Sequence, residues 1–134
     1  MTGELFQIIS QYSILKNSIS SANFNKSLAI EYAMISFLEP QKFSKKLFEL
    51  RARNLIQNLH SSKISSALSG LTIGLEIAGS RKFWMGNNVI LVGTSPMVDI
   101  YQAFFKKQKI ETKTIDSNSI SLTGLKSIYK NYIC

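Results

Sequence analysis

The chain has 134 residues, 45% hydrophobic and 18% charged, which excludes a compositionally disordered protein and allows one domain with a buried core. The formal net charge of +8 would suit an anionic partner, but the basic residues fall in separate elements without interleaved aromatic residues, so we do not expect nucleic-acid binding. No long apolar run and no secretory signal are present, which predicts a cytoplasmic protein without a membrane span.

The sequence offers few ligands for metal or disulfide chemistry. Its one cysteine, Cys134, excludes an internal disulfide framework and a cysteine-based metal cluster. Its one histidine, His60, cannot form a metal site with other histidines. We therefore predict no metal ligands.

Apolar residues recur at helical spacing in the first part of the chain. The four stripes run from Leu5 to Leu15, from Phe24 to Ile35, from Phe43 to Leu55 and from Ile64 to Ala78. We expect SISSAN, residues 18–23, to form a loop and Pro40 to end the second helix or begin the third. These patterns predict a helical layer over about residues 1–84.

The pattern changes after Trp84. MGNN is typical of a turn, and VILV predicts a short strand that is covered on both faces. Ser95 is expected to cap the next helix, with Pro96 in its first turn. The buried stripe of that helix would be Met97, Ile100, Tyr101 and Phe104. IETKTID and SLTGLKSIYKNYI then predict a second strand and a closing helix, so residues 85–134 form a β-α-β-α unit whose strands are parallel.

The segment GTSP, residues 93–96, follows the first predicted strand. Ligands of open parallel sheets gather beyond the carboxyl ends of the strands, and a helix that begins there favours anions. Gly93 would allow a purine or a phosphate to approach the backbone, and Thr94 and Ser95 offer hydroxyl groups. A plain strand-to-helix turn has the same chemistry, so the residues leave both interpretations open.

Gly70 and Gly74 share one face of a strong helical pattern, although each glycine costs about 1 kcal/mol relative to alanine. A bare helix face indicates close approach by a neighbour. That neighbour is either another helix or strand, or a flat ligand such as an adenine ring. In the second case Glu76 would meet a ribose hydroxyl; otherwise it is a surface charge.

Three segments carry a family resemblance: MTGELF at the start, LFELRARNL with ALSGLTIGLEIA in the middle, and VILVGTSPMVDIYQAF with LTGLKSI toward the end. Together they resemble the C-terminal half of the 2-keto-3-deoxygalactonate kinases, or 2-dehydro-3-deoxygalactonokinases. The VGTS turn is similar to the adenosine motif of the wider sugar kinase, hexokinase and actin superfamily. The resemblance implies one C-terminal kinase domain over residues 1–134, with a partial α/β, ribonuclease H-like fold that is mostly helical.

The resemblance also implies a transferase of carbohydrate metabolism that uses ATP and Mg²⁺ to phosphorylate a hydroxyl of 2-keto-3-deoxygalactonate. It implies that the nucleotide is bordered by three residues at a strand end, Gly93, Thr94 and Ser95. On the adenosine side of the nucleotide it places Gly70, Gly74 and Glu76. It assigns the substrate or a phosphate to three residues at another strand end facing the cleft: Thr2, Gly3 and Glu4.

The chain departs from the family pattern at its start, because Met1 lies inside the MTGELF motif. We expect the N-terminal domain to be absent, with two phosphate loops and the aspartate that would hold Mg²⁺. No catalytic residue is therefore predicted, and we expect a truncated chain that is inactive alone. It would self-associate or bind a complementing N-terminal kinase chain; the alternative is a non-catalytic remnant that binds an anion or a protein.

Overall fold

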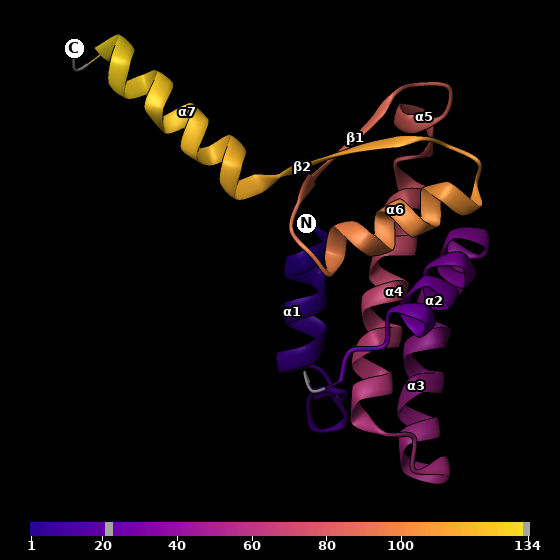
Figure 1. The fold of residues 1–134 in the computed structure, drawn as a ribbon. Helices are drawn as coiled ribbons and strands as arrows, with labels where there is room; N and C mark the ends of the chain where they lie inside the picture. The colour runs from indigo at the N-terminus through magenta and orange to yellow at the C-terminus, as the bar shows by residue number, and fades with distance from the viewer. Residues whose placement is uncertain (21–22, 133–134) are drawn as a thin grey trace. The chain divides into compact units, whose positions relative to one another are not determined.

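The computed structural model describes residues 1–20 and 23–132. It divides the chain into two compact units, Met1–Met85 and Gly86–Cys134, which Figure 1 draws as ribbons. Ser21 and Ala22 of the predicted loop, and Cys134, lie outside the described residues. Within them, no helix is both long enough and apolar enough to cross a membrane.

The secondary structure in the described part of the first unit consists of helices. Its elements are α1 Thr2–Tyr12, η1 Lys16–Ser18, α2 Lys26–Leu38, η2 Pro40–Lys42, α3 Phe43–Gln57, α4 Ser61–Gly79 and α5 Arg81–Trp84, where η denotes a 3-10 helix. The four predicted stripes lie on α1 to α4, which confirms them as helices. Two stripe residues are exceptions. Leu15 lies beyond α1, although it is buried in the core, and Phe24 lies before α2. The short helix α5 was not predicted.

Local chemistry explains where these helices begin and end. The Asn25 side chain accepts a hydrogen bond from the Leu28 backbone N–H at 3.0 Å and so caps α2. Pro40 opens η2 directly after α2. Asn58 takes a left-handed conformation with φ of 50° and ends α3.

The core of the first unit lies among α1, α2, α3 and α4. Its buried residues are Ile9, Leu15, Tyr32, Leu50, Ile64, Ala67, Leu68 and Leu71. At the end of the unit, the Trp84 indole N–H donates to the Ile77 carbonyl oxygen at 2.8 Å, and its ring lies 6.1 Å from that of Phe37. This tryptophan therefore fastens α5 to the last turns of α4 and to α2.

Helices α2 and α4 approach each other unusually closely. A Cβ atom added to Gly70 would lie 2.1 Å from the Ala29 carbonyl oxygen, and one added to Gly74 would lie 2.1 Å from the Ala33 carbonyl oxygen. Both distances are far inside van der Waals contact. The two glycines therefore allow the backbones of the helices to touch.

The second unit contains the predicted β-α-β-α order: β1 Val89–Gly93, α6 Met97–Lys107, β2 Thr112–Asp116 and α7 Ser117–Tyr132. The strands are parallel, with Val89 opposite Thr112 and Gly93 opposite Asp116, which confirms the predicted parallel pairing. Helix α6 packs against both strands, and α7 continues from the end of β2 (Figure 1).

Two details of the second unit differ from the sequence prediction. The N-cap of α6 is Pro96, not Ser95, and the Ser95 hydroxyl donates to the Asp99 carboxylate at 2.9 Å. The predicted interior strand is also open in the described structure, because Ile90 and Val92 are each 56% exposed. Helix α6 covers only the opposite face of β1, and no strand among the described residues pairs with its other edge.

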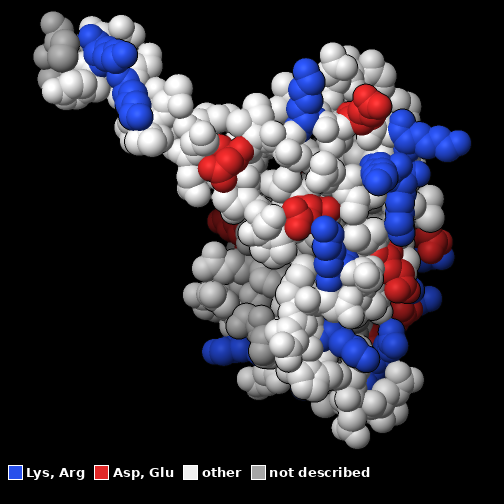
Figure 2. All heavy atoms as spheres, in the orientation of Figure 1, with Lys and Arg blue, Asp and Glu red and all other residues white. Residues whose placement is uncertain are grey.

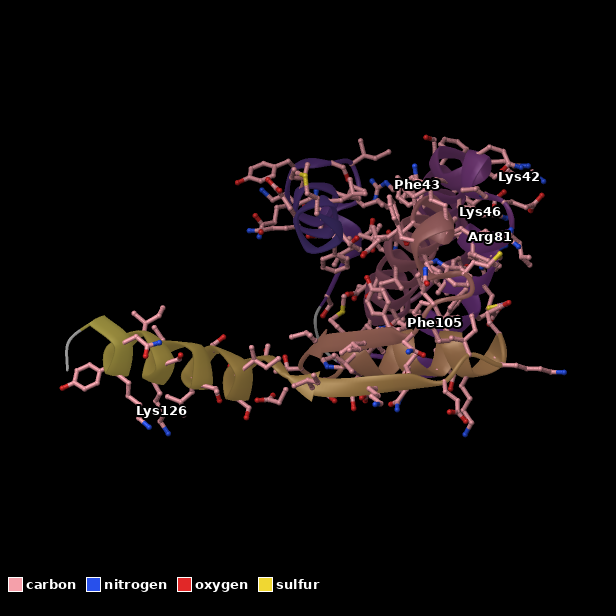
Figure 3. All side chains as sticks on the ribbon, turned by 90° about the horizontal axis from the view of Figure 1, so that it is seen from above. Lys42, Phe43, Lys46, Arg81, Phe105 and Lys126 are labelled. Atoms are coloured by element: carbon pink, nitrogen blue, oxygen red, sulfur yellow. The ribbon has the colours of Figure 1, made fainter. Side chains whose placement is uncertain are left out.

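Charged residues of both signs alternate on the surface that Figure 2 shows. In the first unit, Lys42 is hydrogen-bonded to Glu39, and Lys46 donates to Glu49 at 2.8 Å. The two lysines are labelled in Figure 3. The hydrogen bond from the Lys46 ammonium holds the pKa of Glu49 below its usual value. Part of the positive charge is therefore compensated locally.

The α2–α4 contact predicts that Gly70→Ala destabilises the first unit. Alanine favours a helix by up to about 1 kcal/mol, but the added methyl group must displace the backbone of α2, so we expect a net loss of about 1 to 3 kcal/mol in the free energy of unfolding. Urea titration followed by circular dichroism measures it. Gly79→Ala is the matched control, because it lies in the same helix with nothing within 4 Å of the added Cβ. Equal stability of the two variants would contradict the close contact.

Candidate functional site

The residues predicted to bind ligands fall in both units. Residues 2–4, 70, 74 and 76 belong to the first unit, and residues 93–95 belong to the second. The predicted ligand contacts therefore form two groups, each within its own compact unit.

Thr2, Gly3 and Glu4 form the first turn of α1. The expectation that they sit at a strand end is wrong for the described structure. Helical geometry begins at Thr2, since Leu5 N–H already donates to the Met1 carbonyl oxygen at 2.9 Å.

The structure brings this first turn to α4. The Thr2 hydroxyl donates a hydrogen bond to the Glu76 carboxylate, and the two residues line a cavity of about 350 Å³ between α1 and α4. Its lining is mostly apolar: Met1, Thr2, Glu4, Leu5, Ile8, Thr72, Leu75 and Glu76. Thr2 was assigned to the substrate or a phosphate and Glu76 to the nucleotide, but in the structure both line the same cavity.

The charges in this cavity limit the ligands it can take. Glu4 and Glu76 are both carboxylates, no Lys, Arg or His side chain lines the cavity, and Met1 brings its amino group to the lining. Two carboxylates against one ammonium group disfavour a phosphate or a carboxylate, whereas hydroxyl groups can donate hydrogen bonds to the carboxylate oxygens. The cavity therefore suits the hydroxyl groups of a sugar or ribose.

Sequence reasoning missed Thr72 and Leu75 as lining residues of this cavity. On α4, Thr72 lies four residues before Glu76, and Leu75 lies one residue before it. The four-residue spacing to Thr72 places it on the same helix face and is the signal that could have identified it.

The bare face of α4 is occupied by protein. A Cβ atom on Gly70 would also lie 2.9 Å from Tyr32 Cβ, and one on Gly74 would lie 2.9 Å from Ser36 Cβ. The structure therefore supports the helix-packing alternative at Gly70 and Gly74, because α2 leaves no space for an adenine ring there. Only Glu76 of this group faces a cavity.

The GTSP turn follows the carboxyl end of β1, as predicted. A Cβ atom on Gly93 would lie 2.8 Å from Val98 Cγ2, so the strand end is tightly packed on one side. The Thr94 carbonyl oxygen accepts from the Val98 N–H at 3.3 Å. With Ser95 bonded to Asp99, each residue of the turn contacts the first turn of α6.

Asp99 is a further residue that sequence reasoning missed. Its carboxylate lies in the first turn of α6, where it offsets the positive end of the helix dipole. A phosphate at this helix terminus would meet that negative charge, whereas an adenine amino group or a ribose hydroxyl could donate to it. The turn is therefore better suited to a nucleoside than to a phosphate.

The residues described give no metal centre. No cluster of three or more His, Cys, Asp or Glu side chains that could hold a metal ion occurs among them. Glu4 and Glu76 alone provide fewer oxygen ligands than Mg²⁺ normally takes from proteins and phosphates together. The described residues therefore do not provide a set of ligands that fits Mg²⁺.

Comparisons with curated proteins find two kinases. The chain is 30% identical over 129 residues to the Rhizobium meliloti (strain 1021) protein named "Probable 2-dehydro-3-deoxygalactonokinase", covering 93% of this chain and 42% of that protein. It is 26% identical over 129 residues to 2-dehydro-3-deoxygalactonokinase of Escherichia coli (strain K12), covering 96% of this chain and 44% of that protein. The chain thus spans less than half the length of these relatives.

A solved structure shows the same fold. The crystal structure of a Sinorhizobium meliloti protein described as a 2-dehydro-3-deoxygalactonokinase aligns with a TM-score of 0.84 and 27% identity, covering 97% of this chain and 44% of that one. The sequence model of the 2-keto-3-deoxy-galactonokinase family matches residues 1–128. With its motifs, and with a mostly helical fold that includes a small two-stranded parallel sheet, this chain belongs to the 2-keto-3-deoxy-galactonokinase family.

Proposed function

We propose that this chain is the adenosine-binding, C-terminal part of a sugar-acid kinase that transfers phosphate from ATP to 2-keto-3-deoxygalactonate. The family match over residues 1–128 is the observation that carries the proposal. The whole domain would have the ribonuclease H-like fold of the sugar kinases, hexokinase and actin. Cytoplasmic location is part of the same proposal, because ATP is a cytoplasmic substrate.

The nucleotide contacts are proposed at the turn that follows β1. Gly93, Thr94 and Ser95 stand at the carboxyl end of a parallel strand, where ligands of such sheets collect. The Asp99 carboxylate favours the nucleoside over the phosphates there. This part of the chain would therefore hold adenosine, and the phosphates would extend toward other parts of a complete kinase.

The second set of contacts is proposed at the cavity between α1 and α4. Thr2, Glu4 and Glu76 offer one hydroxyl and two carboxylates to hydroxyl groups of the ribose or the sugar acid. Gly3 would contribute only backbone, and its Cβ position is open. The hydrogen bond between Thr2 and Glu76 would hold both side chains on one wall of this cavity.

We expect no phosphoryl transfer by the chain alone, because its described residues do not fit Mg²⁺. Mg²⁺ in such kinases neutralises the charge that develops on the phosphates, and the protein must hold it in place. Here Thr2, Glu4 and the 93–95 turn bind and orient hydroxyl groups. They supply no clamp for the γ-phosphate.

Gly93→Ala tests the nucleotide contact. If adenosine approaches the backbone at Gly93, the added methyl group should weaken ADP binding by about tenfold, the effect of losing about 1.4 kcal/mol of contact. Calorimetric titration with ADP measures it. Because the methyl group would also meet Val98, the double variant Gly93→Ala/Val98→Ala relieves that clash, and Val98→Ala alone is its control. ADP affinity restored in the double variant would show that the glycine serves only to accommodate Val98.

The open surfaces of the second unit suggest where a complementing chain binds. β1 has an unpaired edge among the described residues, and Ile90 and Val92 are exposed beside it. Helix α7 exposes a stripe of apolar side chains: Leu122, Leu125, Ile128 and Tyr129. A two-stranded sheet is marginal in water, and an open edge invites another strand. The stretch that the relatives have beyond this match is the proposed occupant, with a second copy of this chain as the competing one.

We therefore expect turnover only when an N-terminal half from a full-length relative is supplied. The assay incubates the chain with ATP, Mg²⁺ and 2-keto-3-deoxygalactonate, with and without that half, and light scattering follows the complex. Leu125→Lys should weaken the complex by about tenfold through loss of apolar burial. Ser127→Lys is the matched control, because it adds the same charge at an exposed position of the same helix outside the apolar stripe. Turnover by the chain alone, or a monodisperse monomer with the half present, would contradict the proposal.

A further inference from the structure

A second cavity lies in the first unit and shares no lining residue with the cavity at Thr2 and Glu76. It has a volume of about 210 Å³ and is formed where the start of α2, the end of α3 and the start of α4 meet. Leu28, Leu59 and Ala67 provide apolar walls, and the polar lining residues are Asn25, Tyr32, Arg53 and Lys63. Two of these seven residues are cations and none is an acid.

The buried tyrosine organises the polar side of this cavity. Tyr32 is only 8% exposed, and its hydroxyl accepts a hydrogen bond from Arg53 Nη1 at 2.9 Å. Since that bond uses the hydroxyl as an acceptor, its proton remains available to donate. Arg53 Nε donates to Gln57 at 3.2 Å, which fixes the guanidinium at both ends and leaves Nη2 for another acceptor.

The positive charge of this cavity is compensated only in part within the described residues, by an electrostatic interaction between Arg53 and Glu49. Neither Arg53 nor Lys63 forms an ion pair with any of them. Glu49, one turn before Arg53 on α3, is already bonded to Lys46 at 2.8 Å and lies 3.8 Å from Lys45. Asn25, which caps α2, adds the N-terminal end of that helix to the same side.

We infer that this cavity binds a small oxyanion, independently of the kinase site. Arg53 and Lys63 would each donate a charge-assisted hydrogen bond, and the Tyr32 hydroxyl would donate a third. Because Arg53 and Lys63 are both exposed, these bonds compete with water, so we expect a weak affinity. Inorganic phosphate and a small dicarboxylate such as succinate share this chemistry and differ in shape.

The experiment titrates the ¹⁵N-labelled chain with sodium phosphate and, separately, with sodium succinate, at ionic strength held constant with chloride. We expect saturable amide shifts confined to residues 25–32, 53–59 and 63–67, with a dissociation constant in the millimolar range. Lys63→Gln should raise that constant by about tenfold, because one charge-assisted bond is lost. Tyr32→Phe should raise it several-fold.

The matched control is Lys107→Gln on α6, which makes the same change in net charge and does not line this cavity. Lys63 is exposed and holds no other side chain, so its variant remains folded and interpretable even if Arg53→Gln is not. Equal effects of Lys63→Gln and Lys107→Gln, or shifts spread over all lysines without saturation, would overturn the inference. Preference for phosphate or for succinate would identify which oxyanion shape the cavity takes.

Discussion

The backbone contact between α2 and α4 is the constraint on which the first unit depends. With carbonyl oxygens of Ala29 and Ala33 directly against Gly70 and Gly74, the two helices cannot slide or rotate without steric overlap. Helix α4 is thereby fixed along its length. Its start then packs into the hydrophobic core, and its later turns carry Glu76 to α1 and Ile77 to the indole of Trp84. Backbone packing thus determines where both functional and structural side chains stand.

Much of the secondary structure could be predicted because apolar periodicity reports directly on burial. The helices α1 to α4 follow this rule, whereas the apolar run of β1 predicted a strand whose Ile90 and Val92 are exposed. A bare glycine face carries less information, since a helix and an adenine ring both require a surface without side chains. Gly70 and Gly74 show this limit of sequence-based prediction. Their spacing indicates that a neighbour approaches the helix closely, but it does not identify the neighbour. Ser95 shows a second limit. Serine is a favoured N-cap residue, but in the structure the N-cap position of α6 is Pro96.

The candidate site shows a different limit of sequence reasoning. Thr2 and Glu76 could each be selected, but their hydrogen bond depends on the angle at which α1 meets α4, and no local pattern encodes it. The bond also changes the chemistry, since it makes one acidic wall from residues assigned to two ligands. Asp99 acts likewise at the other turn. The carboxylates in the α1–α4 cavity and at the turn after β1 favour ligands with hydroxyl groups. Phosphate groups would bind at cationic surfaces instead.

The environment of Trp84 gives the molecule a built-in optical label. It is the only tryptophan in the sequence, it is largely buried, and its N–H is bonded to Ile77 within the first unit. Indole emission responds to the polarity around the ring, so tryptophan fluorescence reports on α4 and α5 alone, whereas tyrosines such as Tyr32 and Tyr101 occur in both units. The melting of one half can therefore be followed separately from that of the other, without any added dye.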